Sequence, residues 1–169
     1  DGSSKFAPGG QWGYFPSVAF AWQMHREKFF EKFSKLNEAK LRLGWGTTGN
    51  QNTPPYQFIG SYIANPNPYP GNNGGEIAMV PINVANRLLT WETTYQTNAG
   101  LDLGFFNNRL TTSLDLYRKQ TEDLLQRMPL APSDGYDFIL ANIGSLENKG
   151  FEINLNVDII KNDNVKWNV

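Results

Sequence analysis

Four carboxylates have the side chains that acid–base chemistry needs: Asp102, Asp115, Glu152 and Asp158. Glycosidases hold two such groups roughly 5–10 Å apart, one as an acid and the other as a base or nucleophile. Each of the four, however, alternates with apolar residues in an extended segment, where a hydrated polar face requires charged side chains anyway. The pattern favours solvated residues, so the sequence predicts no catalytic residue and no enzymatic activity.

Metal, phosphate and nucleic-acid sites are not predicted either. The chain has one histidine, His25, and no cysteine, so it lacks the ligand clusters that bind zinc. Gly44, Gly46 and Gly49 only superficially suggest a phosphate loop, because neither a lysine nor a helix N-terminus follows them. The net charge of −1 offers no basic surface for nucleic acid. We therefore expect no cofactor, no metal and no nucleic-acid partner.

The carboxylates belong to long extended segments, and the hairpin at residues 93–119 is the clearest of them. Before its turn, one face carries Tyr95, Thr97, Ala99, Leu101, Leu103 and Phe105, while the other carries Gln96, Asn98, Gly100, Asp102 and Gly104. Asn107 and Asn108 predict a two-residue turn, because asparagine tolerates positive φ. That turn sets the register and places Gly100 beside Asp115. Arms of about a dozen residues match the ~9–11 that a tilted strand needs to cross a bilayer.

Four further strands are predicted from the same alternation, at residues 18–25, 40–46, 151–159 and 165–169. A short helix is expected over residues 26–36, where phenylalanines recur at helical spacing. The connections alternate between short and long, as in barrels with tight periplasmic turns and long outer loops. The predicted fold is all-β: an antiparallel meander of about six long strands forming part of a transmembrane outer-membrane β-barrel, with one short periplasmic helix.

The polar strand faces are expected to line the barrel lumen, with Asn98, Asp102, Asp115, Tyr117 and Glu152 among the lining residues. The longest connection, residues 49–86, is rich in proline, glycine and asparagine. Its tyrosines Tyr56, Tyr62 and Tyr69 are expected to contact substrate or a partner. Aromatic residues near strand ends are predicted to form a girdle at the membrane interface: Trp12, Tyr14, Phe15, Trp91, Phe105, Phe106 and Trp167.

Short motifs run along nearly the whole chain. They include Leu-Arg-Leu-Gly-Trp-Gly at residues 41–46, Thr-Gly-Asn-Gln at 48–51, Trp-Glu-Thr-Thr at 91–94, Asn-Ile-Gly-Ser at 142–145 and Glu-Asn-Lys-Gly-Phe-Glu at 147–152. In this order and at these separations they resemble the C-terminal half of the barrel in SusC/RagA-type TonB-dependent transporters of Bacteroidetes.

This resemblance implies a nutrient importer of the cell outer membrane. Its barrel would be plugged by an N-terminal domain, surrounded by lipid and capped by a SusD-like surface lipoprotein, and TonB would energise the import of oligosaccharides or peptides. Transporter barrels have 22 strands, so about six cannot close one. Residues 1–169 are therefore expected to be a partial β-barrel domain without the plug, the TonB-contacting region and the remaining strands.

Two other functions fit parts of the pattern. A soluble all-β module, such as a carbohydrate-binding sandwich, would pack its apolar strand faces together as a core, whereas a barrel wall exposes them as a continuous band. Strand length and the alternating connections favour the wall. A β-rich enzyme would need a convergent set of acid, base or nucleophile, which the sequence does not contain.

Overall fold

The computed structural model describes residues 1–33, 35–65, 78–161 and 166–168. Within them the chain forms these strands: β1 Ser17–Gln23, β2 Leu36–Asn50, β3 Ser61–Asn65, β4 Ala78–Asn83, β5 Glu92–Phe105, β6 Leu110–Glu122, β7 Leu125–Pro129, β8 Phe138–Asn142, β9 Ser145–Lys161 and β10 Lys166–Asn168. Three short 3-10 helices connect them: η1 Met24–Arg26, η2 Lys28–Lys32 and η3 Pro132–Asp134. The described part of the chain is therefore nearly all-β.

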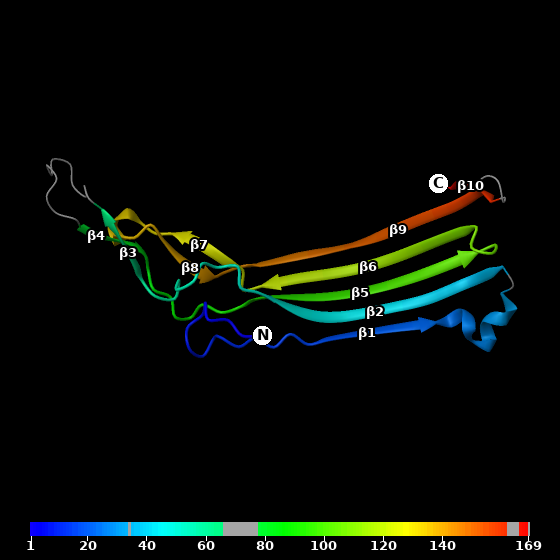
Figure 1. The fold of residues 1–169 in the computed structure, drawn as a ribbon, viewed down its shortest axis with the longest axis horizontal. Helices are drawn as coiled ribbons and strands as arrows, with labels where there is room; N and C mark the ends of the chain where they lie inside the picture. Colours follow the sequence, from blue (N-terminus) through cyan, green and yellow to red (C-terminus); the bar gives the residue numbers. More distant parts are fainter. Residues whose placement is uncertain (34, 66–77, 162–165, 169) are drawn as a thin grey trace. The chain divides into compact units, whose positions relative to one another are not determined.

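Six strands form one sheet in the order β1-β2-β5-β6-β9-β10, and their ribbons run side by side (Figure 1). β1 and β2 pair antiparallel, so that Val18 lies opposite Trp45 and Phe20 opposite Leu43. β2, β5, β6 and β9 have 15, 14, 13 and 17 residues, which exceeds the usual ~5–6 of soluble strands. The predicted six-stranded, antiparallel all-β arrangement is confirmed, although β1 has only seven residues and β10 three.

The turn between β5 and β6 has positive φ at the two predicted asparagines and also at Phe106, whose φ is 53°. Asn107 and Asn108 have φ of 57° and 58°, and the Arg109 amide donates to the Phe106 carbonyl at 3.3 Å. At the far end of the hairpin, the hydroxyls of Thr94 and Thr121 lie 2.9 Å apart, in agreement with the predicted register.

The helix predicted for residues 26–36 is wrong in type and length. The segment forms η1 and η2, and β2 already begins at Leu36. Successive i→i+3 bonds, from the Phe30 amide to the Glu27 carbonyl and from the Phe33 amide to the Phe30 carbonyl, wind the chain more tightly than an α-helix does. The phenylalanine rings contact one another at tilted angles, with centroids 4.9 Å apart for Phe29 and Phe30 and 5.7 Å apart for Phe30 and Phe33.

The two long connections contain strands that the sequence analysis treated as loop. β3 pairs antiparallel with β4, and β7 pairs antiparallel with β8. A parallel bridge from Asn83 to Phe138 joins these hairpins into a second sheet, ordered β3-β4-β8-β7. Tyr69 lies outside the described residues.

The chain divides into two compact units. The loop unit comprises residues 1–15, 48–94 and 121–146, and the strand unit comprises residues 16–47, 95–120 and 147–169. Among the described residues, no helix is long and apolar enough to cross a membrane.

The loop unit has a small apolar core of Phe6, Leu89, Trp91 and Leu140. Trp91 is only 6% exposed, and the Phe15 ring meets it edge-on with centroids 5.3 Å apart. The prediction that Trp91 belongs to an aromatic girdle is therefore wrong, because this ring packs inside the protein.

Candidate functional site

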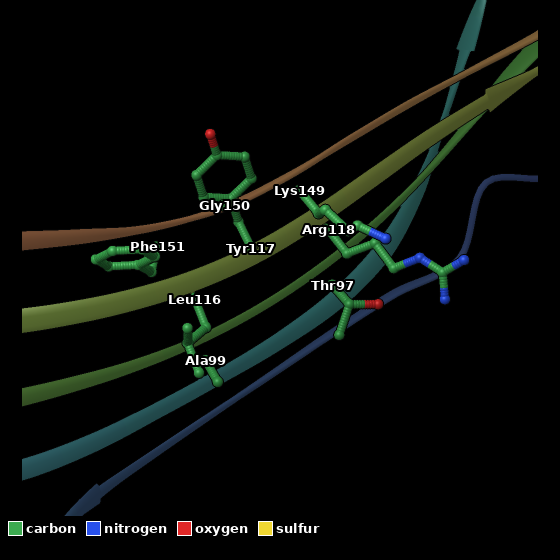
Figure 2. Close-up of a pocket in the computed structure, with 8 residues that line it drawn as sticks. All are labelled: Thr97, Ala99, Leu116, Tyr117, Arg118, Lys149, Gly150 and Phe151. Atoms are coloured by element: carbon green, nitrogen blue, oxygen red, sulfur yellow. The ribbon is translucent and has the colours of Figure 1, made fainter.

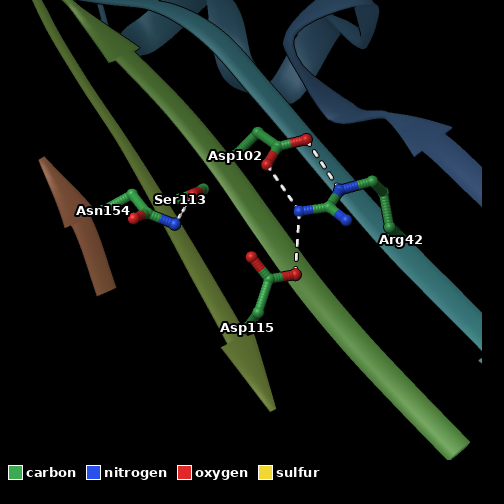
Figure 3. Close-up of polar contacts among 5 residues, drawn as sticks. All are labelled: Arg42, Asp102, Ser113, Asp115 and Asn154. Atoms are coloured by element: carbon green, nitrogen blue, oxygen red, sulfur yellow. Dashed lines mark hydrogen bonds and ion pairs between the residues drawn. The ribbon is translucent and has the colours of Figure 1, made fainter. Parts of the chain in front are cut away.

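The polar face of the strand unit brings together charged side chains from three neighbouring strands (Figure 3). Arg42 of β2 donates from Nε to Asp102 Oδ2 at 2.8 Å and from Nη2 to Asp102 Oδ1 at 2.8 Å, which makes a bidentate pair with β5. The same Nη2 donates to Asp115 Oδ1 of β6 at 2.9 Å. One guanidinium therefore links two carboxylates and three strands. We call Arg42, Asp102 and Asp115 the charged triad.

The triad is half-buried, with about a third of each side chain exposed. Planar two-point bonds of this kind fix orientation as well as charge, and they suit arginine because its guanidinium presents a rigid fork. Two carboxylates and one guanidinium leave the triad with a formal charge of −1.

Gly100 provides the room for this arrangement. A Cβ at Gly100 would lie 2.5 Å from Asp115 Oδ1 and 2.7 Å from Arg42 Cζ. The guanidinium can therefore lie flat across β5 only because the residue beneath it has no side chain. The same contact confirms that Gly100 is the neighbour of Asp115 in the hairpin.

Gly150 on β9 likewise leaves room for the side chain of Tyr117. A Cβ at Gly150 would lie 2.7 Å from the Tyr117 hydroxyl oxygen and 2.9 Å from Tyr117 Cζ. Tyr117 therefore lies across its neighbouring strand. On the polar face, the long side chains of Arg42 and Tyr117 thus lie over glycines of adjacent strands.

Further polar side chains extend the face beyond the triad. Asn154 of β9 donates to the Ser113 hydroxyl at 3.3 Å (Figure 3). A hollow of about 240 Å³ lies beside this pair, and Glu38, Asp102 and Asn156 contribute to its lining. A surface of alternating donors and acceptors of this kind offers replaceable hydrogen bonds to polar solutes rather than a converging acid and base.

The opposite face of the strand unit is apolar and exposed. It carries Val18, Phe20, Leu43, Trp45, Leu116, Phe151, Ile153 and Leu155. Phe151 is 72% exposed and Leu155 is 63% exposed, values that a water-soluble protein rarely combines in one continuous surface. The predicted separation into one apolar and one polar face is thus present in space.

Most predicted site residues lie on this polar face, but one charged residue was missed. Asn98, Asp102, Asp115, Tyr117 and Glu152 are the predicted lining residues, and Asp102 and Asp115 come together through Arg42. Sequence reasoning overlooked Arg42 because its partners are 60 and 73 positions away. The available signal was a cation on the polar face of the alternating segment 40–46, a face that Arg42 shares with Lys40.

The remaining predicted residues have different surroundings. Tyr56 is 68% exposed and Tyr62, at the second position of β3, is 59% exposed. His25 Nδ1 lies 3.2 Å from the Ala39 carbonyl oxygen, so the histidine contacts the backbone of β2. Among the described residues, no group of three or more histidine and acidic side chains could hold a metal ion.

Several motif residues make hydrogen bonds within the loop unit. The Asn142 side-chain amide donates to the carbonyls of Thr90 and Asp123, each at 2.9 Å, and its Oδ1 accepts from the Thr90 amide at 2.9 Å. Glu92 accepts from Asn50 Nδ2 at 3.1 Å and from the Leu125 amide at 3.3 Å. These bonds tie the ends of successive strands and connections to one another.

The chain is similar to known proteins along its whole length. The sequence profile of the family described as TonB dependent receptor-like, beta-barrel matches residues 1–169. The TonB-dependent receptor SusC of Bacteroides thetaiotaomicron is 37% identical over 100% of this chain and 17% of its own length. TonB-dependent receptor P39 of Formosa agariphila is 36% identical over 99% of this chain and 16% of its own length.

A solved structure is also similar. The chain superimposes on the RagAB peptide transporter with a TM-score of 0.81 and 29% identity, covering 96% of this chain and 17% of that chain. The chain thus spans about one sixth of the length of the relatives that it resembles.

Proposed function

This chain belongs to the family of TonB-dependent receptor-like β-barrels, which are outer-membrane proteins, and from that membership we propose that it is one wall of a TonB-dependent importer. The polar face of the strand unit lines the lumen, and the apolar face contacts lipid. The plug domain and the remaining strands belong to other parts of the parent protein. Import by this protein needs binding and gating, and no residue of this chain makes or breaks a bond.

One observation carries this proposal: the long strands have two chemically opposite faces. Phe151 and Ile153 are exposed on one face, while the charged triad lies on the other. A sheet in water would cover its apolar face, whereas a barrel in a bilayer needs that face outward and the polar face toward a hydrated lumen. Because the family match extends over all 169 residues, we do not retain the soluble carbohydrate-binding module.

The substrate we propose is an oligosaccharide or a peptide, delivered with the help of a SusD-like surface lipoprotein. Support comes from two relatives: SusC, a TonB-dependent receptor, and RagAB, which is described as a peptide transporter. The polar face suits either substrate, because both present many hydroxyl or amide groups and neither requires a single strong charge.

Arginine substitutions in the parent transporter test the orientation of the sheet. Leu101→Arg or Leu114→Arg should destabilise the barrel by about 2–4 kcal/mol near the bilayer midplane, because the new charge would face hydrocarbon. Asn98→Arg and Ser113→Arg are the matched controls on the same two strands, and they should assemble normally. Heat-dependent unfolding of the outer-membrane fraction measures both. Equal tolerance at all four positions would refute the assignment of faces.

A further inference from the structure

A hollow of about 450 Å³ lies on the strand unit, between β5, β6 and β9 (Figure 2). Thr97, Ala99, Leu116 and Phe151 line it together with Arg118 and Lys149, and Tyr117 and Gly150 also contribute to the lining. The hollow therefore combines an apolar floor with two cations from neighbouring strands.

The two cations lie on the apolar face of the sheet. Successive side chains of a strand point to opposite faces, so Arg118 shares a face with Leu116 and opposes Asp115. By the same alternation, Lys149 shares a face with Phe151 and opposes Glu152. A charge on a face that contacts lipid is costly unless it reaches the interface or an oppositely charged group.

The positions of Arg118 and Lys149 along their strands allow both cations to reach the membrane interface. Arg118 is four positions before the end of β6 at Glu122, and Lys149 is four positions after the start of β9 at Ser145. Both therefore lie near the strand ends that lead into the long connections, where a bilayer presents its headgroups.

One carboxylate on the same face neutralises only part of this charge. Glu147 Oε1 accepts from Arg118 Nε at 2.6 Å, and Glu147 Oε2 lies 3.9 Å from Lys149 Nζ. The cationic side chains are nevertheless 62% and 74% exposed. The group of three carries a formal charge of +1, and it is open to a further anion.

We infer that this hollow binds a phosphate-bearing anionic lipid of the outer membrane. An acyl chain lies against Ala99, Leu116 and Phe151, and the phosphate contacts Arg118 and Lys149. Arginine and lysine recognise phosphate well, and basic pockets beside apolar membrane surfaces bind lipid headgroups. This inference rests on the orientation in the proposed function, which places the apolar face in the bilayer.

Native mass spectrometry of the purified full-length transporter, loaded with phosphatidylglycerol or phosphatidylcholine, tests the inference. The wild-type protein should retain phosphatidylglycerol in preference to phosphatidylcholine. The double variant Arg118→Gln/Lys149→Gln should lose that preference, with phosphatidylglycerol affinity falling about tenfold or more, since each cation near an anionic headgroup contributes about fivefold. Glu147→Gln should strengthen binding, because it removes the competing carboxylate.

A matched control replaces two cations of the polar face, Lys40→Gln/Lys119→Gln, and it should leave the lipid preference unchanged. If the Arg118/Lys149 variant assembles normally and keeps the full preference for phosphatidylglycerol, the lipid site is refuted while the proposed importer stands. If the wild-type protein retains neither lipid and the arginine substitutions at Leu101 and Leu114 are tolerated, the orientation itself is wrong, and the inference falls with it.

Discussion

The charged triad derives its geometry from a residue that has no side chain. Gly100 lets the Arg42 guanidinium cross β5 and reach Asp102 and Asp115 together. The alternation of residues 96–104 predicts that Asp102 is on the polar face, and the asparagine turn predicts that Asp115 is near Gly100. Neither pattern predicts Arg42 as their common partner, because alternation specifies a face but not the register between β2 and β5.

Removing Arg42 should destabilise the barrel, because Asp102 and Asp115 would lose their shared partner and repel each other. Arg42→Gln should lower the free energy of unfolding by about 1–3 kcal/mol, the usual range for hydrogen bonds to charged groups. Asp102→Asn and Asp115→Asn in the same background should recover part of that loss, since they remove the remaining repulsion. Unfolding in detergent measures the cycle, with Lys40→Gln as control. A triple variant no more stable than Arg42→Gln alone would show that repulsion between the carboxylates is negligible.

The carboxylates of the polar strand faces should matter only modestly for uptake. Alanine at Asp102, Asp115, Glu152 or Asp158 should each lower transport by less than about tenfold, or ~1.4 kcal/mol, because a hydrated wall offers many replaceable bonds. Uptake per correctly assembled transporter is the quantity to measure. Loss of all uptake at normal membrane levels in any one variant would mean that this carboxylate is essential, contrary to a lining role.

At the scale of strands, the sequence predicted the large sheet well and the second sheet not at all. Strict alternation identifies β5 and β6, and Asn107 and Asn108 set their register, because both signals are local. β3, β4, β7 and β8 are short, and β4 contains Pro81. Their sheet depends on a bridge between Asn83 and Phe138, which are far apart in the chain and carry no periodic signal. Trp91 was misassigned because a position near a strand end does not distinguish a core from an interface.

The glycine on β9 offers a test of how neighbouring strands fit together. Gly150→Val should destabilise the barrel by about 1–3 kcal/mol, because the new side chain would overlap the Tyr117 ring and force it to move. Tyr117→Ala in the same background should relieve most of the loss. Thermal unfolding of the two variants and of Tyr117→Ala alone completes the cycle. Additive effects would show that the two side chains do not compete for this space.

At the scale of the whole chain, the two units differ in how they place their apolar side chains. The strand unit separates apolar from polar surface, while the loop unit packs a small core around Trp91 and exposes tyrosines. We expect the long connection at residues 49–86 to lie outside the cell and to meet substrate or the lipoprotein. Its tyrosines were predicted from composition, and the contacts they make in the parent protein stay a prediction.

Substituting the exposed tyrosines should weaken uptake without disturbing assembly. Tyr56→Ala/Tyr62→Ala should reduce substrate uptake or capture of the lipoprotein by about fivefold or more, since truncating an aromatic side chain that anchors a binding surface costs more than about 1 kcal/mol. Leu88→Ala is the control, because Leu88 is an exposed apolar residue of the same unit. Uptake and co-purification of the lipoprotein are the measurements. Normal values for both in the tyrosine variant would exclude these side chains from binding.

The asparagine turn between β5 and β6 also has a kinetic consequence. Asn107 and Asn108 close a short loop at small entropic cost, so this hairpin can form within microseconds once the chain collapses. The Arg42 bonds to β5 and β6 must instead wait for segments 60 and 73 positions apart to meet. Substitutions at Asn107 should therefore slow folding, whereas substitutions at Arg42 should chiefly speed unfolding. Contacts between residues close together in the sequence should therefore form first as the wall assembles, and contacts between distant residues should form later.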